Sequence, residues 1–341
     1  MKIALDATYS VGRNLSGVAV YSRQILYGLA RAHPEAGFQY CYRPHRFLKS
    51  FNEPLSNNAH RRLLLKDLPV SCDLFHGLNQ RIDSTRYRHT VSTFHDLFVL
   101  SGDYSTAEFR QRFAQQARLA AERSNLIIAV SDFTARQIQE LLKVDPARIR
   151  VIHHGVRRPV NSAAKREQMI LFVGAIQKRK NIARLVEAFE SVARGWKLVL
   201  AGSLGYGAQE ALDRIEGSPR KDDIQVLGYV PDNVLDDLYN RASLVAFPSL
   251  DEGFGMPILD AMAHGVPVLT SNVSALPEVS GGAALLVDPS DVTSIAEGLS
   301  RLTNDETLRA HLTQTGLKRS AEFSWEQAVE ATWKVYQELL G

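Results

Sequence analysis

The feature of this sequence that most constrains its fold is a regular alternation of short apolar runs with amphipathic helical patterns. Runs such as KIALDA, FQYCYR, TVSTFHD, LIIAVS and IRVIHHGV are separated by patterns such as GVAVYSRQILYGLARA, EFRQRFAQQARLAAERS and DFTARQIQELLK. Short, nearly continuous apolar runs are typical of strands buried on both faces, which occur in parallel sheets covered by helices. The sequence therefore predicts an α/β protein with doubly wound sheets.

The number of strand patterns predicts two domains. After a polar stretch the runs resume with MILFVGA, KLVLAG, IQVLGYV, SLVAFPS, VPVLTS and AALLVDP. About eleven strands are many for one sheet, and 341 residues are enough for two domains of ordinary size. The polar segment 157–168 separates the two series. We predict one domain over residues 1–160 and a second over 161–320, followed by a helix over 321–341 that is a candidate to pack back on the first domain.

Composition excludes several classes of protein. Hydrophobic residues make up 45% of the chain and charged residues 23%, as in globular proteins. The N-terminal apolar run stops at Asp6, so we expect no signal peptide, and no apolar run approaches the ~20 residues of a membrane helix. Cys41 and Cys72 form no CxxC and no metal-ligand spacing, which favours two reduced thiols in a cytoplasmic protein.

Charge is distributed unevenly between the two halves. Residues 1–160 contain 23 Lys and Arg against 13 Asp and Glu, and the remainder contains 17 against 24. The first half is therefore basic and the second acidic, which indicates different partners for each. A basic half suits an anionic substrate or an acidic membrane surface. A solvated basic surface without a partner is the alternative.

The segment 248–272, PSLDEGFGMPILDAMAHGVPVLTSN, predicts a ligand site at the start of a short helix. It follows the predicted strand SLVAFPS, and ligands in doubly wound sheets bind beyond the carboxyl ends of strands. Pro257 fits the first turn of a helix, and Gly253 and Gly255 let backbone N–H groups approach a ligand closely. A helix N-terminus of this kind suits an anion such as a diphosphate.

Two carboxylates flank this predicted helix start. Glu252 precedes it, and Asp260 lies one turn inside it, so the two acids can reach different parts of one ligand. Carboxylates accept hydrogen bonds from hydroxyls, which makes a sugar ring and a ribose plausible targets. The alternative is a capping acid and an exposed helical acid.

Two further segments are candidates to bind an anion. The first is segment 172–181, FVGAIQKRKN, at the carboxyl end of a predicted strand, which carries the consecutive cations Lys178, Arg179 and Lys180. The alternative for these three cations is an ordinary basic surface. Gly12 and Gly17 lie in a loop before a predicted helix, without the Gly-Lys-Ser/Thr of a P-loop and without GxGxxG.

Histidines occur at two predicted strand ends. His95 precedes Asp96 in STFHDLF, and His153 and His154 lie in VIHHGV. None of the three has metal-ligand spacing to another His or Cys. A structural role and a catalytic role therefore both stay open for each.

The order of these motifs resembles one enzyme family along nearly the whole chain. The motifs are SGVAVYSRQIL, FHDLF, AVSDFTARQI, VIHHGV, FVGAIQKRKN, LGYVPDNVLDDLYNRA and FPSLDEGFGMPILDAMAHGVPVLTSNVSALPEV. They resemble the retaining GT-B glycosyltransferases of group 1, and PSLDEGFGMP with SNVSALPEV is most similar to bacterial mannosyltransferases of polysaccharide and lipid-linked glycan assembly. The resemblance implies two Rossmann-like domains that face each other across a cleft.

The resemblance implies roles for the residues of the second domain. The acid-x7-acid motif of the family falls on Glu252, which would face the donor sugar, and on Asp260, which would face the ribose. Asp260 is one methylene shorter than the usual Glu of the family. Ala175 stands where many members have Arg, so Arg179 or Lys178 would supply that charge. The remaining implied contacts are Lys180 with Arg179 for phosphate, Tyr229 and Val230 for the base, and Gly253, Phe254, Gly255 and Met256 for sugar and diphosphate.

The resemblance also implies roles in the first domain and a mechanism. Gly17 would lie beside the phosphate and His95 near the reacting sugar, with the acceptor on residues 1–160 and the donor on 161–320. Cations and a helix dipole stabilise a departing diphosphate as charge develops on it, so we expect transfer without a metal or another cofactor, with retention at the anomeric carbon. The family favours front-face attack, in which the leaving phosphate takes the acceptor proton.

The expected partners are a nucleotide-sugar donor, with GDP-mannose favoured over dTDP-rhamnose or a UDP-sugar, and a glycan or lipid-linked acceptor. We expect no nucleic-acid partner. The expected location is the cytoplasm, with peripheral contact at an anionic inner membrane face as a further hypothesis. Two other functions stay open: a sugar-nucleotide epimerase of the same fold, and a non-catalytic nucleotide-sugar-binding protein.

Overall fold

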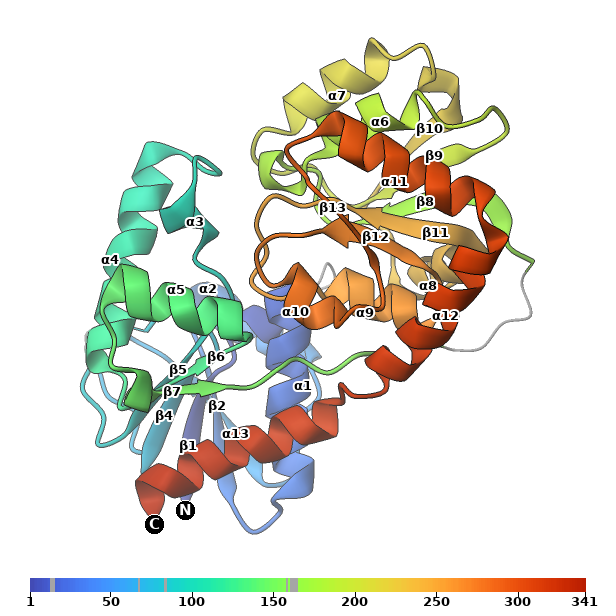
Figure 1. The fold of residues 1–341 in the computed structure, drawn as a ribbon. Helices are drawn as coiled ribbons and strands as arrows, with labels where there is room; N and C mark the ends of the chain where they lie inside the picture. The colour runs from blue at the N-terminus through green and yellow to red at the C-terminus, as the bar shows by residue number, and fades with distance from the viewer. Residues whose placement is uncertain (13–15, 67, 83–84, 158, 160–164) are drawn as a thin grey trace. The chain divides into compact units, whose positions relative to one another are not determined.

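The chain divides into two compact units in a computed structural model. The structure describes residues 1–12, 16–66, 68–82, 85–157, 159 and 165–341. Met1–Gly155 and Ser324–Gly341 form unit 1, and Val156–Phe323 form unit 2 (Figure 1). The units therefore divide after Gly155 and again after Phe323. The predicted linker 157–168 overlaps the first strand of unit 2, and its residues 158 and 160–164 lie outside the described residues.

Unit 1 contains a parallel sheet with the strand order β3-β2-β1-β4-β5-β6-β7. Its strands are β1 (Lys2–Asp6), β2 (Gly37–Tyr42), β3 (Ala59–Leu63), β4 (Leu74–Gly77), β5 (Thr90–Phe94), β6 (Leu126–Ala129) and β7 (Ile149–Val151). Its helices are α1 (Gly17–Ala32), α2 (Pro44–Phe47), α3 (Phe98–Ser101), α4 (Ala107–Arg123), α5 (Asp132–Leu142) and α13 (Trp325–Leu340), with 3-10 turns η1 (Thr8–Ser10), η2 (Leu48–Asn52) and η3 (Pro146–Arg148).

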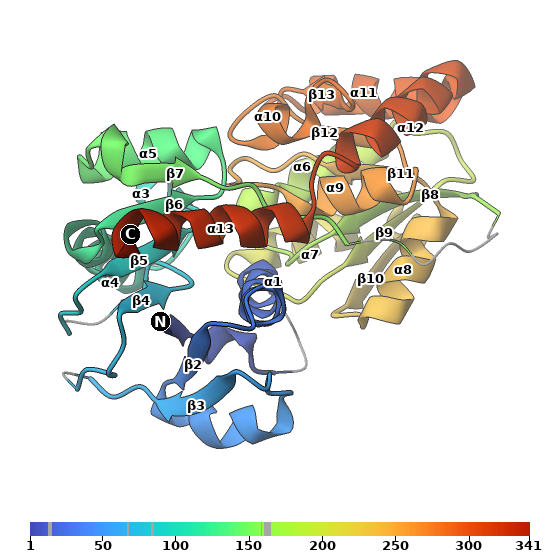
Figure 2. The same ribbon diagram turned by 90° about the horizontal axis from the view of Figure 1, so that it is seen from below.

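Both faces of this sheet are covered by helices. Phe75 and Phe94 belong to an apolar cluster with residues of α4 and α5. Because side chains alternate along a strand, their neighbours His76 and Thr93 point to the other face. There His76 meets Tyr336 of α13, and Thr93 meets Tyr21 of α1. Figure 2 shows α1 and α4 on opposite sides of the strands.

The last helix returns to unit 1 and packs against α1. Its N-cap is Ser324, whose side chain accepts a hydrogen bond from the backbone N–H of Gln327 at 3.1 Å. Gly28 of α1 allows the close approach, since a Cβ there would come within 2.4 Å of Val329 Cγ2. Gly155 likewise allows the backbone to pass close to the start of α13, since a Cβ at this position would lie 2.2 Å from the backbone nitrogen of Trp325. The helix is thus part of unit 1 by direct packing.

Unit 2 contains a second parallel sheet with the order β10-β9-β8-β11-β12-β13. Its strands are β8 (Glu167–Val173), β9 (Lys197–Ala201), β10 (Ile224–Gly228), β11 (Ala242–Phe247), β12 (Val268–Ser271) and β13 (Leu285–Val287). Its helices are α6 (Ile182–Phe189), α7 (Ala208–Glu216), α8 (Asp232–Arg241), α9 (Met256–Ala263), α10 (Leu276–Ser280), α11 (Val292–Asn304) and α12 (Glu306–Ser320), with 3-10 turns η4 (Lys178–Lys180) and η5 (Lys221–Asp223).

The strand order locates the ligand-binding edge of unit 2. From β8 the chain continues outward to β9 and β10, and then returns to the other side of β8 at β11. Neighbouring strands at such a reversal send their following loops in opposite directions, which leaves a crevice at their carboxyl ends. The segments that follow β8 and β11 are the two in this unit from which the sequence predicts anion contacts.

None of the helices in the described part of the chain combines the length and the apolar character that crossing a bilayer requires.

We predict that Gly28→Ala lowers the thermal midpoint of unfolding and costs about 1–3 kcal/mol of stability, because the stiff Val329 side chain leaves no room for a methyl group. Val329→Ala makes that room. The double variant should therefore be less destabilised than the sum of the two single variants in urea unfolding. Additive effects would contradict this account of the helix contact.

Candidate active site

The centre of the candidate site is a buried cluster of one carboxylate and two cations. The Glu252 carboxylate accepts a hydrogen bond from Lys180 Nζ and pairs with Arg179 Nη1 at 2.8 Å. The three side chains are nearly closed to solvent, with exposed fractions of 8% for Glu252, 8% for Lys180 and 11% for Arg179. Burial raises the pKa of Glu252, but the charges of Arg179 and Lys180 outweigh it and lower that pKa to about 2. Glu252 is therefore an anion at neutral pH.

The cluster lies where the strand order reverses. Arg179 and Lys180 follow β8, Glu252 follows β11, and these two strands pair in parallel (Figure 1). The carboxyl ends of neighbouring parallel strands meet at one edge of the sheet, so residues separated by 72 positions come into contact. The sequence predicted each group as a candidate, and the structure brings them together.

The loops that carry the cluster are also joined by their backbones. The Leu250 N–H donates to the Arg179 carbonyl at 2.8 Å, and the Arg179 guanidinium donates to the Asp251 carbonyl at 2.8 Å. Asn181, in the left-handed region with φ 63°, donates from its side-chain amide to the carbonyls of Pro248 at 3.0 Å and Pro289 at 2.7 Å. Lys180 Nζ lies 4.5 Å from the centre of the Phe247 ring. These contacts hold both cations at the sheet edge.

The structure distinguishes between the two cations that could replace the arginine absent at Ala175. Lys178 is exposed, whereas the Arg179 side chain is nearly closed to solvent and pairs with Glu252. The backbone beside Ala175 is closely packed, because a Cβ at Gly202 would lie 1.8 Å from the Gly174 carbonyl oxygen. Arg179 is therefore the cation that joins the cluster.

Helix α9 begins beside Glu252 without a side-chain cap. Its cap residue is Gly255, with φ 105°, and Pro257 lies in its first turn as predicted. A Cβ at Gly255 would come within 2.7 Å of Leu276 Cδ2, so only glycine combines this backbone conformation with this packing. Gly253, Phe254 and Gly255 are buried, and Met256 is half-buried. The backbone N–H groups of a first turn are the donors that a helix leaves for an anion.

Ser274 is a site residue that the analysis of the sequence did not identify. Its hydroxyl accepts a hydrogen bond from the Glu252 N–H at 3.2 Å, and the Ala275 N–H donates to the Glu252 carbonyl at 3.2 Å. Ser274 has φ 58°, which is unusual for a residue with a side chain. The SNVSALPEV motif was the available signal, because it supplies this support for Glu252.

Asp260 occupies different surroundings from Glu252. It is half-buried on α9, and its carboxylate accepts a hydrogen bond from the Arg157 N–H at 3.5 Å. The Arg157 guanidinium pairs instead with Asp236 at 2.8 Å. Burial raises the pKa of Asp260 to about 6, against the opposing charge of Arg157. Arg157 was missed as a site residue because it falls in the predicted linker.

The predicted base-contacting turn also lies at the carboxyl edge of this sheet. Tyr229, with 38% of its surface exposed, and half-buried Val230 follow β10 directly. The Gly202 N–H donates to the Gly228 carbonyl at 2.8 Å, which places this turn beside the end of β9. The turn is therefore on the same edge of the sheet as the cluster.

The candidate residues of unit 1 lie apart from these in the chain. His95 follows β5, and its Nε2 donates to the Leu78 carbonyl at 2.9 Å, which leaves Nδ1 as the acceptor of a neutral ring. Burial lowers the pKa of His95 to about 4, so the ring is neutral at pH 7. It packs against Tyr21 with a centroid distance of 4.7 Å and against His154 at 5.4 Å. Gly17 is exposed at the start of α1.

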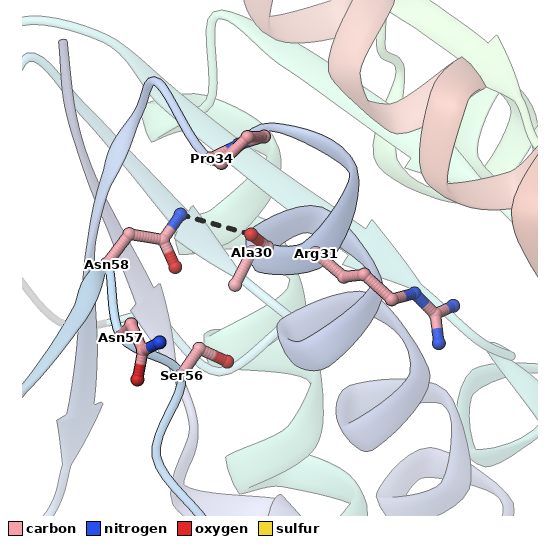
Figure 3. A pocket seen from close by; sticks show the side chains of 6 residues that line it. All are labelled: Ala30, Arg31, Pro34, Ser56, Asn57 and Asn58. Atoms are coloured by element: carbon pink, nitrogen blue, oxygen red, sulfur yellow. Dashed lines mark hydrogen bonds between the residues drawn. The ribbon is translucent and has the colours of Figure 1, made fainter.

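A hollow of about 430 Å³ in unit 1 is not part of the candidate site (Figure 3). Its lining residues belong to the end of α1 and to the segments that lead into β2 and β3, so it lies at the amino ends of these strands. Ligands of doubly wound sheets bind at the opposite edge, beyond the carboxyl ends of the strands. Asn58 there donates to the carbonyls of Ala30 and Ala36, both at 3.1 Å, and so satisfies backbone carbonyls at the end of α1.

No group of three His, Cys, Asp or Glu side chains able to hold a metal occurs among the described residues.

Comparison with known proteins assigns the family. Residues 156–319 match the family model "Glycosyl transferases group 1", and residues 28–158 match "Glycosyltransferase Family 4". The O-antigen chain mannosyltransferase B of Escherichia coli is 32% identical over 77% of this chain and 74% of its own length. The chain belongs to the group 1 glycosyltransferases.

Further relatives agree with this assignment. The serotype-specific mannosyltransferase WbdA of Escherichia coli is 30% identical over 74% of this chain, and the match spans 34% of the length of WbdA. The crystal structure of HepE from Anabaena, in complex with UDP and glucose, has a TM-score of 0.77 at 16% identity and covers 99% of this chain and 100% of HepE. The fold is the predicted α/β GT-B fold, with two Rossmann-like sheets.

We predict that Glu252→Gln costs on the order of 3 kcal/mol of stability at pH 7, because the pKa of Glu252 is lowered from 4.5 to about 2 in the folded chain. This stabilisation is fully present above pH 4.5 and is lost as the pH falls toward 2. Urea unfolding between pH 7 and pH 3 should show the wild-type advantage shrinking below about pH 4.5. The exposed Glu297→Gln is the matched control, and an equally pH-dependent difference for it would contradict the assignment to Glu252.

We predict the opposite sign for Asp260→Asn, because the pKa of Asp260 is raised from 3.8 to about 6. Ionising this carboxylate opposes folding, so wild-type stability falls as the pH rises from about 4 to 6, and the amide avoids that loss. The variant should be more stable than wild type by about 3 kcal/mol at pH 7 and close to it near pH 4. A variant that is less stable at pH 7 would contradict the burial argument.

Proposed function

We propose that this glycosyltransferase moves a hexose, with mannose favoured, from a nucleotide diphosphate sugar to a glycan or lipid-linked acceptor. We further propose that transfer retains the anomeric configuration and requires neither a divalent metal nor another cofactor. The observation that carries the proposal is the buried Glu252–Arg179–Lys180 cluster at the strand-order reversal beside α9. The two mannosyltransferases of Escherichia coli support the choice of sugar, and GDP-mannose is the donor we favour.

Unit 2 has the charges that a diphosphate leaving group needs. When the bond between the anomeric carbon and the diphosphate oxygen breaks, negative charge grows on that oxygen. The cluster contains two cations and one carboxylate, so it carries a net positive charge. This charge and the N–H groups in the first turn of α9 would stabilise the negative charge on the leaving oxygen. Arg179 and Lys180 thus supply the stabilisation that a divalent cation provides in other enzymes.

We assign the two acids to different parts of the donor. Glu252 is anionic, because its pKa is about 2, and would accept hydrogen bonds from the hydroxyls of the sugar. Asp260 lies further into α9 and would accept from the ribose. Tyr229 and Val230 would contact the base, and Gly253, Phe254, Gly255 and Met256 would line the sugar and diphosphate.

Unit 1 would supply the acceptor side, with Gly17 beside the phosphate. The acceptor hydroxyl attacks the anomeric carbon on the face that the diphosphate leaves, and its proton passes to the departing phosphate oxygen. The His95 ring would line the site rather than act as a base, because its low pKa disfavours the protonated form that a base must reach. Its hydrogen bond to the Leu78 carbonyl fixes the orientation of the ring. We propose a cytoplasmic role in polysaccharide biosynthesis, with nucleic acid excluded as a partner.

We predict that GDP-mannose raises the thermal midpoint of the wild-type chain in EDTA and that Lys180→Met weakens this binding at least tenfold, measured by calorimetry. The matched control is Lys178→Met, which removes the exposed neighbouring cation and should bind like wild type. UDP-glucose and dTDP-rhamnose tested in parallel identify the nucleotide. Equal losses for the two variants would remove the buried cluster from the donor site.

Transfer to a lipid-tailed synthetic mannoside tests the reaction itself. The anomeric coupling of the product in NMR should show retention, and Glu252→Gln should abolish turnover. Activity that vanishes in EDTA and returns with magnesium would end the metal-independent proposal. Conversion of the sugar nucleotide without an acceptor would identify an epimerase, and donor binding without any turnover would identify a binding protein.

A further inference from the structure

An exposed apolar patch lies on unit 1, between η2 and the segment after β3. Its members are Leu48 (80% exposed), Phe51 (61%), Leu55 (38%), Leu63 (40%), Leu65 (36%) and Leu68 (58%). They make up a third of the exposed large apolar side chains in the described part of the chain, although the segment is short. We call them the 48–68 patch. Exposed apolar side chains mark an interaction site rather than ordinary surface where they form one contiguous patch.

Contacts within unit 1 join the two parts of this patch. The Phe51 ring packs edge-on against Phe47 at 5.6 Å, and the Arg61 guanidinium lies 5.2 Å from the centre of the Phe51 ring. Arg61 Nε also donates to the Ser50 carbonyl at 3.1 Å. Leu63 lies two residues after Arg61 on β3 and so points to the same side of the strand. Figure 2 shows the helical segment around residues 44–52 beside β3, at one edge of unit 1.

The patch lies among positive charges. The exposed basic side chains of this region are His45, Lys49, His60, Arg62 and Lys66, and the half-buried ones are Arg43, Arg46 and Arg61. Glu53 is the one acidic residue of the described segment 43–66, and it already pairs with Arg23 at 2.8 Å. Asp67 lies outside the described residues. The surroundings of the apolar side chains therefore carry a net positive charge.

We propose that the 48–68 patch docks this enzyme on an anionic lipid membrane. In this arrangement Leu48 and Phe51 enter the boundary between headgroups and acyl chains, and the exposed cations Lys49 and Lys66 contact anionic headgroups. Apolar side chains together with cations are the combination that binds such a surface peripherally, because each part alone binds weakly. A soluble anion would use the cations and leave Leu48 and Phe51 exposed, so the apolar side chains favour a membrane.

Charge also argues against a second copy of the chain on this face. β3 is an edge strand of the sheet and could in principle pair with another β3. Such pairing would bring His60, Arg61 and Arg62 of two copies together, and like charges placed opposite each other oppose strand pairing. A partner surface that complements this basic patch must be negative. The same region of a second copy is positive and so does not complement it.

Vesicle flotation of the full chain tests the proposal. Wild type should bind phosphatidylcholine vesicles that contain about a third phosphatidylglycerol, and should bind pure phosphatidylcholine at least about tenfold more weakly. High salt should release it, since screening acts on the cations. Leu48→Gln/Phe51→Gln and Lys49→Gln/Lys66→Gln should each lower the bound fraction on the order of tenfold. All of these side chains are exposed, so we expect the thermal midpoints to stay at the wild-type value.

The matched control is Arg118→Gln/Leu141→Gln, which removes an exposed cation and an exposed leucine from α4 and α5 of the same unit. It should bind vesicles like wild type. Calorimetric binding of GDP-mannose should be unchanged in both patch variants, which separates this proposal from that on the donor site. Equal binding of wild type to anionic and neutral vesicles, or unchanged binding by Leu48→Gln/Phe51→Gln, would overturn it. A dimer in sedimentation that disappears in this variant, without vesicle binding, would assign the patch to a second copy instead.

Discussion

Unit 2 depends on the pairing of one buried carboxylate with two buried cations across the strand-order reversal of its sheet. A buried charge is unfavourable unless it is paired, so the burial of Glu252 requires Arg179 and Lys180, and the reverse also holds. Because these residues follow β8 and β11, the same interaction holds together two loops that are distant in sequence. The cluster has an excess of one positive charge, which leaves it suited to one more anion.

Neutral contacts around the cluster hold its charged residues in place. Asn181 ties the cationic turn to the carbonyl of Pro248, and Ser274 holds the backbone of Glu252 from the other side. Gly255 permits α9 to begin next to Leu276. The acid-x7-acid segment is therefore both a packing motif and a chemical one. A substitution at Ser274 or Asn181 would move the charges without removing any of them.

Much of this fold could be predicted from the sequence, and the exceptions have physical reasons. Buried strands with continuous apolar runs were identified, whereas β3 and β4 were not. β3 (AHRRL) is an edge strand with exposed arginines, and β4 (LFHG) is four residues long and contains a histidine, so neither has an apolar pattern. Glu252 and Lys180 were recognised separately, but their direct pairing depends on strand order. The contact of Arg157 with Asp260 was missed because it crosses 103 positions from an apparent linker.

The two acids of the motif lie eight positions apart, yet their environments shift their pKa values in opposite directions. Cations lower the pKa of Glu252 to about 2, whereas burial raises that of Asp260 to about 6. Glu252 therefore stabilises the folded chain, and Asp260 opposes folding when it ionises. A chain selected only for stability would have an amide or an apolar residue at position 260. A carboxylate in such surroundings is typical of a binding residue, because hydroxyl donors from a ligand would add hydrogen bonds to the one that the Arg157 N–H donates.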